Sequence, residues 1–265
     1  MLGVNVHSLN RGFHWLEFLI MALSVVNSLR MQAVMATFFA FTAAIRPKAD
    51  RRVYSMSKCA ECGIYACRLG KKESAPEHCP MLSEESLYGE AANQYLRPET
   101  RELGLTAALT ESEGYCKWTR LEEIVQFSRR AGFTRLGLAF CVGLRKEAAE
   151  VARVLKRAGF EVESVTCKTG SVPKEHLGIK EEEKVRPGEF EPMCNPVCQA
   201  MLLDKAKTQL NVLLGLCVGH DTLFFKYSQS PVTVPAVKDC VLAHNPFGAI
   251  YAAQYFSKRL SDLQK

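Results

Sequence analysis

The sequence predicts an α/β protein built on a mostly parallel, doubly wound sheet of about four strands, with helices on both faces. In the second half of the chain, short apolar runs alternate with longer amphipathic stretches, the order that strand–helix–strand units produce. The 265 residues are 48% hydrophobic and 23% charged, which is ordinary for a globular protein able to bury a sizeable core.

Helical segments precede the first expected strand. The stretch LYGEAANQYL (87–96) follows an acidic start, and Pro98 opens a second helix toward residue 108. Thr119 stands three residues before Glu122, which is the spacing of a capping box, and apolar residues follow at helical intervals. We therefore expect a helical lead-in to the sheet.

The alternating region then supplies the sheet and its covering helices. Gly159 ends the first helix of this region, and Asn195 caps the second, with Pro196 at its first position. The segment 168–193 is rich in Lys and Glu and reads as a solvated connector, with a lid as the alternative. We expect strands at residues 134–140, 160–166, 211–216 and 232–237, and helices at residues 144–160, 195–210, 221–228 and 245–259.

Residues 1–55 differ from the rest of the chain and form the first of three expected regions: 1–55, 56–82 and 83–265. They contribute +4 of the net charge of +6, so the body is nearly neutral and lacks the broad basic field of nucleic-acid binders. Two apolar runs, at residues 15–29 and 33–45, are each shorter than a membrane-spanning helix.

Three interpretations of this extension remain open. It is a membrane-associated hairpin or anchor, a packed helical extension, or the product of a start assigned too far upstream, with Met56 as the true first residue. A signal peptide fits poorly, because the charged start is thin and no small-residue cleavage site follows. We expect a cytoplasmic protein, with membrane association through residues 13–45 as the alternative.

Eleven cysteines are the most informative feature of the composition, and none lies in the first 58 residues. An odd number of cysteines cannot pair completely. In a chain with the pattern of a cytosolic α/β protein, closely spaced thiols indicate metal or redox chemistry more than structural disulfides.

The strongest cluster lies in CAECGIYACRLGKKESAPEHCP and forms the expected metal-binding module, residues 56–82. Two, four and eleven residues separate the successive cysteines, and the first pair can chelate one ion from a tight turn. Four thiolates complete a zinc site or hold a [4Fe–4S] cluster, and ligand type alone does not separate the two. The expected ligands are Cys59, Cys62, Cys67 and Cys79.

A second thiol-rich site is expected at the carboxyl ends of the strands, where an open parallel sheet binds its ligands. One cysteine follows each of the four expected strands: Cys141, Cys167, Cys217 and Cys240. Cys198 also stands near a helix N-terminus, which favours a thiolate. The alternative is a purely structural role, in which each of these cysteines is a small, buried hydrophobic residue. The candidates for this second site are Cys141, Cys194, Cys198 and Cys217, and the candidates for catalytic groups are Cys141, Cys198, His220 and His244.

Several segments together resemble an uncharacterised family of bacterial and archaeal proteins described as metal-binding. They are CAECGIYAC with the later HCP, LGLAFCVGL, MCNPVC, GLCVGHD and KDCVLAHNP, and the resemblance covers Met56 to about Leu260. It implies four N-terminal cysteines followed by an α/β domain, and metal binding without a known reaction. Two features depart from the family pattern: the 55-residue extension, and Cys240, where a basic residue is expected.

The sequence therefore predicts a metal-binding protein of unknown reaction, with zinc or an iron–sulfur cluster in the four-cysteine site and a second thiol-rich site at the rim of the sheet. A thiol-dependent or redox enzyme acting at the rim is the first alternative, and a zinc-stapled interaction module is the second. No glycine-rich dinucleotide fingerprint follows the first expected strand, so a nicotinamide or flavin cofactor is not supported.

Overall fold

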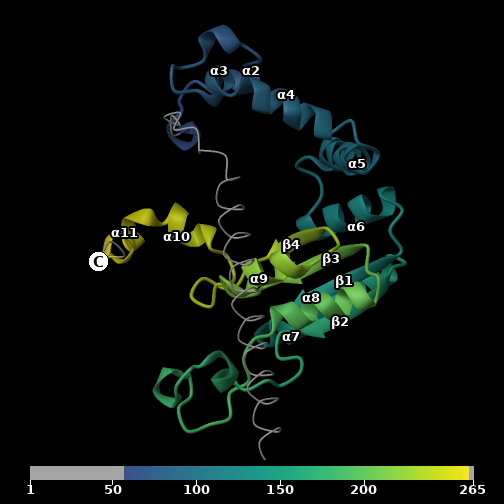
Figure 1. Cartoon of the computed structure of the whole chain (residues 1–265), viewed down its shortest axis with the longest axis vertical. Helices are drawn as coiled ribbons and strands as arrows, with labels where there is room; N and C mark the ends of the chain where they lie inside the picture. Colours follow the sequence, from purple (N-terminus) through teal and green to yellow (C-terminus); the bar gives the residue numbers. More distant parts are fainter. Residues whose placement is uncertain (1–56, 263–265) are drawn as a thin grey trace, which may run out of the picture. The chain divides into compact units, whose positions relative to one another are not determined.

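The computed structural model describes residues 57–262 and divides the chain into two units, residues 1–85 and 86–265 (Figure 1). The expectations for residues 1–55, including the membrane hairpin and the start at Met56, lie outside the described residues. Among the helices of residues 57–262, none has the length and apolar character needed to cross a membrane.

The described part of the first unit consists of short helical turns joined by tight bends. Two 3-10 helices, Cys59–Glu61 and Lys72–Ser74, alternate with the α-helices α2 (Ala66–Leu69) and α3 (Pro80–Ser83). Gly70 caps α2 in the left-handed conformation, with φ = 65°. This chain of turns carries the four clustered cysteines.

The second unit is built on a sheet of four parallel strands. The strands are β1 (Arg135–Phe140), β2 (Glu161–Thr166), β3 (Leu210–Leu214) and β4 (Val232–Ala236). Their order is β2-β1-β3-β4, and β1 pairs with both β2 and β3. The predicted fold class is confirmed, because the alternating apolar runs of the sequence are these four strands.

Helices cover both faces of the sheet, as a doubly wound topology requires. One core cluster joins α6 (Arg120–Arg130) and α7 (Arg145–Arg157) to the face that carries Leu136 and Leu138. The other joins α8 (Pro196–Lys205) and α9 (His220–Tyr227) to the face that carries Ala139, Cys141 and Cys167. The period of two along the strands thus sends the rim cysteines toward α8 and α9.

The helix cap predicted at Thr119 is present in the structure. The Thr119 hydroxyl accepts from the backbone N–H of Glu122, and the Glu122 carboxylate accepts from the N–H of Thr119, so the capping box at the start of α6 is formed. The lead-in helices are α4 (Glu85–Gln94) and α5 (Pro98–Gly114), and α5 extends six residues beyond the expected end at residue 108.

Two boundaries differ from the sequence prediction. The third strand ends at Leu214 and not at residue 216, because Gly215 adopts φ = 62°, which extended backbone cannot continue through. The last helix, expected at residues 245–259, is two helices, α10 (Phe247–Tyr251) and α11 (Ala253–Ser261). Ala252 separates them with a non-helical conformation, φ = −101° and ψ = 34°.

The segment 168–193 is an ordered excursion with its own polar centre. Its neck is an antiparallel bridge between Pro173 and Pro192, flanked by an ion pair of 2.5 Å between Lys174 and Glu191. At its tip the Lys184 ammonium lies 2.6 Å from a carboxylate oxygen of Glu175 and also 2.6 Å from one of Glu181. The two 3-10 turns of the excursion, Lys174–Leu177 and Glu181–Glu183, supply these carboxylates.

Candidate functional site

The carboxyl ends of β1 and β3 form the switch point of the sheet. The chain crosses from β1 to β2 on one side and later returns to place β3 on the other side of β1. Loops that leave neighbouring strands in opposite directions open a crevice, which is where such sheets bind their ligands. Two cysteines continue the pairing beyond the strands: Cys167 N–H donates to Phe140 O (2.8 Å), and Cys141 N–H donates to Leu214 O (3.2 Å).

Three thiols meet at this edge, and we call Cys141, Cys167 and Cys194 the rim cluster. The Sγ atoms of Cys194 and Cys167 lie 3.9 Å apart, within hydrogen-bonding distance for sulfur. Cys167 Sγ also accepts a hydrogen bond from the N–H of Val142 (3.4 Å), the residue after Cys141, so the Cys141 side chain is its neighbour on the other side. Cys167, only 1% exposed, is therefore the central thiol, with one sulfur on each side.

Cationic groups flank the two outer thiols. The Lys238 ammonium lies 3.5 Å from Cys141 Sγ, and the charges of Lys168 and His220 act on Cys194. Gly143 allows the approach of Lys238, because a Cβ at that position would lie 2.8 Å from Lys238 Nζ. Because the ammonium is the flexible end of its side chain, a small shift of Lys238 would accommodate a Cβ, so Gly143 eases the approach without being required for it.

The three thiols differ in protonation. The hydrogen bond from Cys167, together with the Gly143 N–H and Lys238, lowers the pKa of Cys141 to about 5 against the desolvation that burial imposes. The hydrogen bond from Cys167, with the charges of Lys168 and His220, lowers the pKa of Cys194 to about 5. The interactions with the sulfurs of Cys141 and Cys194, together with burial, raise the pKa of Cys167 above its ordinary value, against the opposing effect of the Val142 N–H. The directions of these shifts favour thiolates at Cys141 and Cys194 and a protonated thiol at Cys167.

Two further cysteines lie within electrostatic reach of the rim cluster. Burial raises the pKa of Cys217, and the negative charges of Cys141 and Cys194 raise it further. Cys240 is exposed, and its charge acts on Cys217 and on Lys238. Cys217 thus lies beside the thiolates as a protonated neighbour.

Two polar side chains, those of Gln199 and Asn195, hold the backbone around the rim cluster in place through hydrogen bonds. The Gln199 amide, fully buried in the first turns of α8, donates to Phe140 O (3.2 Å) and Val165 O (2.7 Å) and so ties the ends of β1 and β2 together. The Asn195 side chain caps α8 by accepting from Cys198 N–H (3.0 Å), and Asn195 N–H donates to Cys167 O (2.8 Å). These bonds hold residue 194 against residue 167.

The sequence candidates divide into two groups in the structure. Cys141 and Cys194 come together, Cys217 lies beside them, and His220 acts on Cys194. Within residues 57–262, no hydrogen bond joins the Cys198 thiol to the cluster; only its backbone N–H is engaged. The ring of His244 accepts from the N–H of Asp239 (3.1 Å) inside its own turn, and the two backbones are also bonded to each other.

The central member of the cluster was missing from the sequence candidates. Its position directly after the second strand, like that of Cys141 after the first, placed Cys167 at the same edge, but no feature of the sequence favoured it over Cys198 as a candidate. Lys238 and Lys168 follow β4 and β2 in the same way, and their role depends on distances that the sequence does not contain.

The four N-terminal cysteines are placed differently. Cys62 Sγ accepts a hydrogen bond from Tyr65 N–H (3.4 Å), and Tyr65 is in the left-handed conformation, with φ = 50°. Cys59 and Cys67 are exposed. Within the described residues 57–262, no three His, Cys, Asp or Glu side chains are arranged as a ligand group for a metal ion, so the four-cysteine site stays a prediction.

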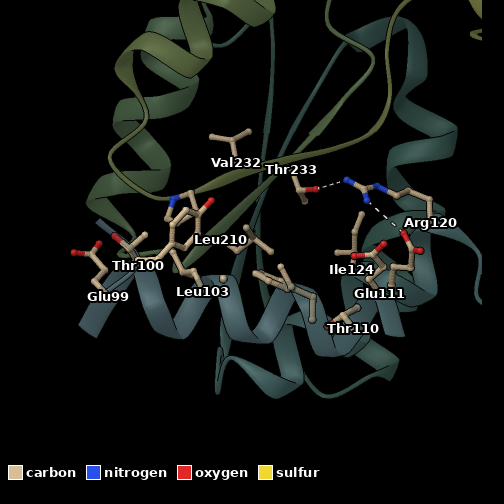
Figure 2. Close-up of a pocket in the computed structure, with 16 residues that line it drawn as sticks. Glu99, Thr100, Leu103, Thr110, Glu111, Arg120, Ile124, Leu210, Val232 and Thr233 are labelled. Carbon is tan, nitrogen blue, oxygen red and sulfur yellow. Dashed lines mark hydrogen bonds and ion pairs between the residues drawn. The ribbon is translucent and has the colours of Figure 1, made fainter. Parts of the chain in front are cut away.

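A cavity of the second unit lies at the other end of the strands. It measures about 780 Å³ and is lined by α5, α6 and the first residues of β3 and β4. Figure 2 shows an apolar floor that includes Leu103 and Leu210, and Arg120 bonded to Thr233 at its border (2.9 Å). No cysteine or histidine is among its lining residues. The thiols with shifted pKa values, and not this cavity, are therefore taken as the candidate functional site.

Comparisons with known proteins match most of the chain to a family of unknown function. Residues 79–234 match the profile of a family described as "Protein of unknown function (DUF1847)". Over 203 residues, the chain is 39% identical to an uncharacterised protein of Methanocaldococcus jannaschii, which covers 77% of this chain and 98% of that protein. The matched family range contains the whole rim cluster and, of the four N-terminal cysteines, Cys79 alone.

Proposed function

The chain belongs to the DUF1847 family of proteins of unknown function, and from that premise we propose that it carries out thiol-dependent chemistry at the rim cluster. One observation supports this proposal most strongly. The buried sulfur of Cys167 lies 3.9 Å from Cys194 Sγ and beside Cys141, the Lys238 ammonium lies 3.5 Å from Cys141 Sγ, and the charge of Lys168 acts on Cys194. Such an arrangement stabilises thiolates, which are the reactive form of cysteine.

The two outer cysteines differ in solvent exposure, and we therefore propose different roles for them. Cys194 is partly exposed and can meet a substrate, whereas Cys141 is 9% exposed and faces the Lys238 ammonium. We therefore assign the nucleophile to Cys194, and the storage of a second negative charge to Cys141. Free thiols of this kind require a reducing compartment, which agrees with the cytoplasmic location expected from the sequence.

The test is the pH dependence of alkylation, measured for each cysteine by mass spectrometry with iodoacetamide. The rate at Cys194 is expected to stay nearly constant down to about pH 5 and to fall below it, because only the thiolate reacts. N-Acetylcysteine in the same tube is the reference, and its rate falls about tenfold per pH unit below about pH 8.5.

Two variants sharpen this test. Lys168→Met removes a cation that acts on Cys194 and is expected to move its alkylation profile to higher pH. Cys198→Ser is the matched control, since the Cys198 thiol makes no hydrogen bond to the rim cluster, and it should leave the profile unchanged. A Cys194 profile that followed N-acetylcysteine would refute the thiolate site.

Metal binding by Cys59, Cys62, Cys67 and Cys79 is the second candidate function. The donor set suits zinc or a [4Fe–4S] cluster, and the bond from Tyr65 N–H to Cys62 Sγ is of the kind that stabilises a ligating thiolate. Because no three of these side chains form a ligand group in the structure, metal binding would have to draw them together.

Elemental analysis of the anaerobically purified full chain tests this second function. Bound zinc, or iron with sulfide and a brown colour, is expected in the native protein and should be lost in Cys62→Ser. Cys116→Ser is the control, because Cys116 is an exposed cysteine outside both thiol groups. Protein that is free of metal and fails to bind added zinc would exclude a four-cysteine site.

A further inference from the structure

Cys167 and Cys194 are neighbours in space although 27 residues separate them along the chain. Asn195 N–H donates to Cys167 O (2.8 Å), and Met193 N–H donates to Val172 O (2.7 Å), so the two backbone segments run side by side. The two sulfurs are 3.9 Å apart and need only a small approach to bond. We propose that Cys194 and Cys167 form a reversible dithiol–disulfide couple that reduces small disulfides; this deepens the proposed function and rests on it.

Burial sets the order of events. Cys194 is partly exposed, whereas Cys167 is 1% exposed, so an incoming disulfide meets Cys194 first. Lys168 and His220 place positive charge near Cys194, which favours both the attacking thiolate and the departing one. Cys167 then stands behind Cys194 as the resolving thiol.

The reaction proceeds in two exchanges. The Cys194 thiolate attacks one sulfur of the substrate disulfide, a mixed disulfide forms at Cys194, and the first substrate thiolate departs. Cys167 transfers its proton to the Cys141 thiolate and attacks the Cys194 sulfur, and the second substrate thiolate departs. The protein dithiol is oxidised by two electrons, the substrate disulfide is reduced by two, and an excess of a small thiol reverses both steps.

Cys141 is the base of the second exchange. Its neighbour Val142 donates its N–H to Cys167 Sγ (3.4 Å), which keeps the two cysteines side by side, and the Lys238 ammonium, 3.5 Å from Cys141 Sγ, stabilises negative charge on Cys141 before the reaction. Once Cys194 is in the mixed disulfide, it no longer competes for the Cys167 proton. The transfer to Cys141 then releases the nucleophile that closes the disulfide.

The experiment uses the reduced full chain and glutathione disulfide as the probe. After reaction, free thiols are blocked with N-ethylmaleimide, and the digest is mapped by mass spectrometry without reduction. The expected product is one peptide pair joined through Cys167 and Cys194, with two glutathione molecules released for each disulfide formed. A different pairing, through Cys198 or Cys217, or no pairing at all, would overturn the couple.

Variants separate the three roles. Cys167→Ser is expected to accumulate glutathione on Cys194, whereas Cys194→Ser removes the mixed disulfide. Cys141→Ser is expected to slow release of the second glutathione by about 100-fold and to make that step steeply pH-dependent, because the base is lost. Cys198→Ser is the control and should behave as the native chain.

The outcomes distinguish this proposal from the one on which it rests. If Cys194 is alkylated at acidic pH but never pairs with Cys167, the thiolate site stands and the redox couple is wrong. If Cys167→Ser fails to fold, the pairing map of the native chain still decides, because it requires no substitution.

Discussion

Gly215 is the residue at which β3 gives way to the rim loop that carries Cys217. Its φ of 62° lies in the left-handed region, and a Cβ there would lie 1.9 Å from Leu144 Cδ1. Gly215→Ala is therefore expected to lower the free energy of unfolding by about 2–4 kcal/mol, as the sum of backbone strain and overpacking. Chemical denaturation measures the loss.

Gly132→Ala is the matched control for that substitution. Gly132 has φ = 68°, but no atom lies within 4 Å of the position that an alanine Cβ would take, so the variant should cost only the backbone strain of about 1–2 kcal/mol. Equal losses in the two variants would show that contact with Leu144 makes no contribution at Gly215.

Single residues were predictable where their partners are close in sequence. Thr119 with Glu122 and Asn195 with Pro196 form the expected caps, because a cap depends on three or four consecutive residues. The preference for Cys198 over Cys167 had no such basis. Which cysteine faces the cluster depends on strand register and on the packing of α8, and both are set by residues far away in the sequence.

At the scale of elements, the excursion 168–193 depends on charge. Lys184 is 8% exposed, and Glu175 and Glu181 raise its pKa, while the lysine lowers the pKa values of both carboxylates. The carboxylate contribution to stability is present above about pH 4.5 and is lost as pH falls through the lowered pKa values. The lysine contribution is present below pH 10.5 and is lost as pH rises through the raised pKa.

This electrostatic arrangement predicts local opening in acid. Hydrogen exchange of residues 174–189 is expected to accelerate below about pH 4.5, before the strands lose protection. Lys184→Met should accelerate it at neutral pH as well, because two carboxylates would then face each other without a cation. Arg186→Met is the control, since the 3.7 Å ion pair of Arg186 with Glu189 is solvent-exposed. Similar effects of the two variants would contradict the special role of Lys184.

Elements were predictable to the extent that a short pattern defines them. All four strands fall within a residue or two of their expected bounds, because each is a short segment rich in apolar or β-branched residues, which alternate with polar residues in β2. The break at Ala252 between α10 and α11 was not foreseen, since no proline or glycine stands there and alanine favours a helix. The internal order of the excursion 168–193 was missed because its stabilising ion pairs join residues whose spacing follows no regular period.

For the whole molecule, the alternation of strands and helices was enough to predict a doubly wound parallel sheet. The strand order β2-β1-β3-β4 was not predictable from that alternation, and it is what brings Cys141 and Cys167 to adjacent strand ends at the switch point. The position of a cysteine after a strand therefore does not predict which thiols meet. That depends on which strands are neighbours in the sheet.

The paired neck of the excursion 168–193 has a consequence for how the protein tolerates change. Val172, Pro173 and Lys174 pair with Met193, Pro192 and Glu191, so the chain returns to its point of departure before it reaches Cys194. Pairing at the neck offsets the entropic cost of closing this loop, and that cost depends only weakly on the length of the tip. Lengthening or trimming the tip should thus leave the spacing of the two sulfurs intact, whereas a one-residue slip at the neck would draw them apart.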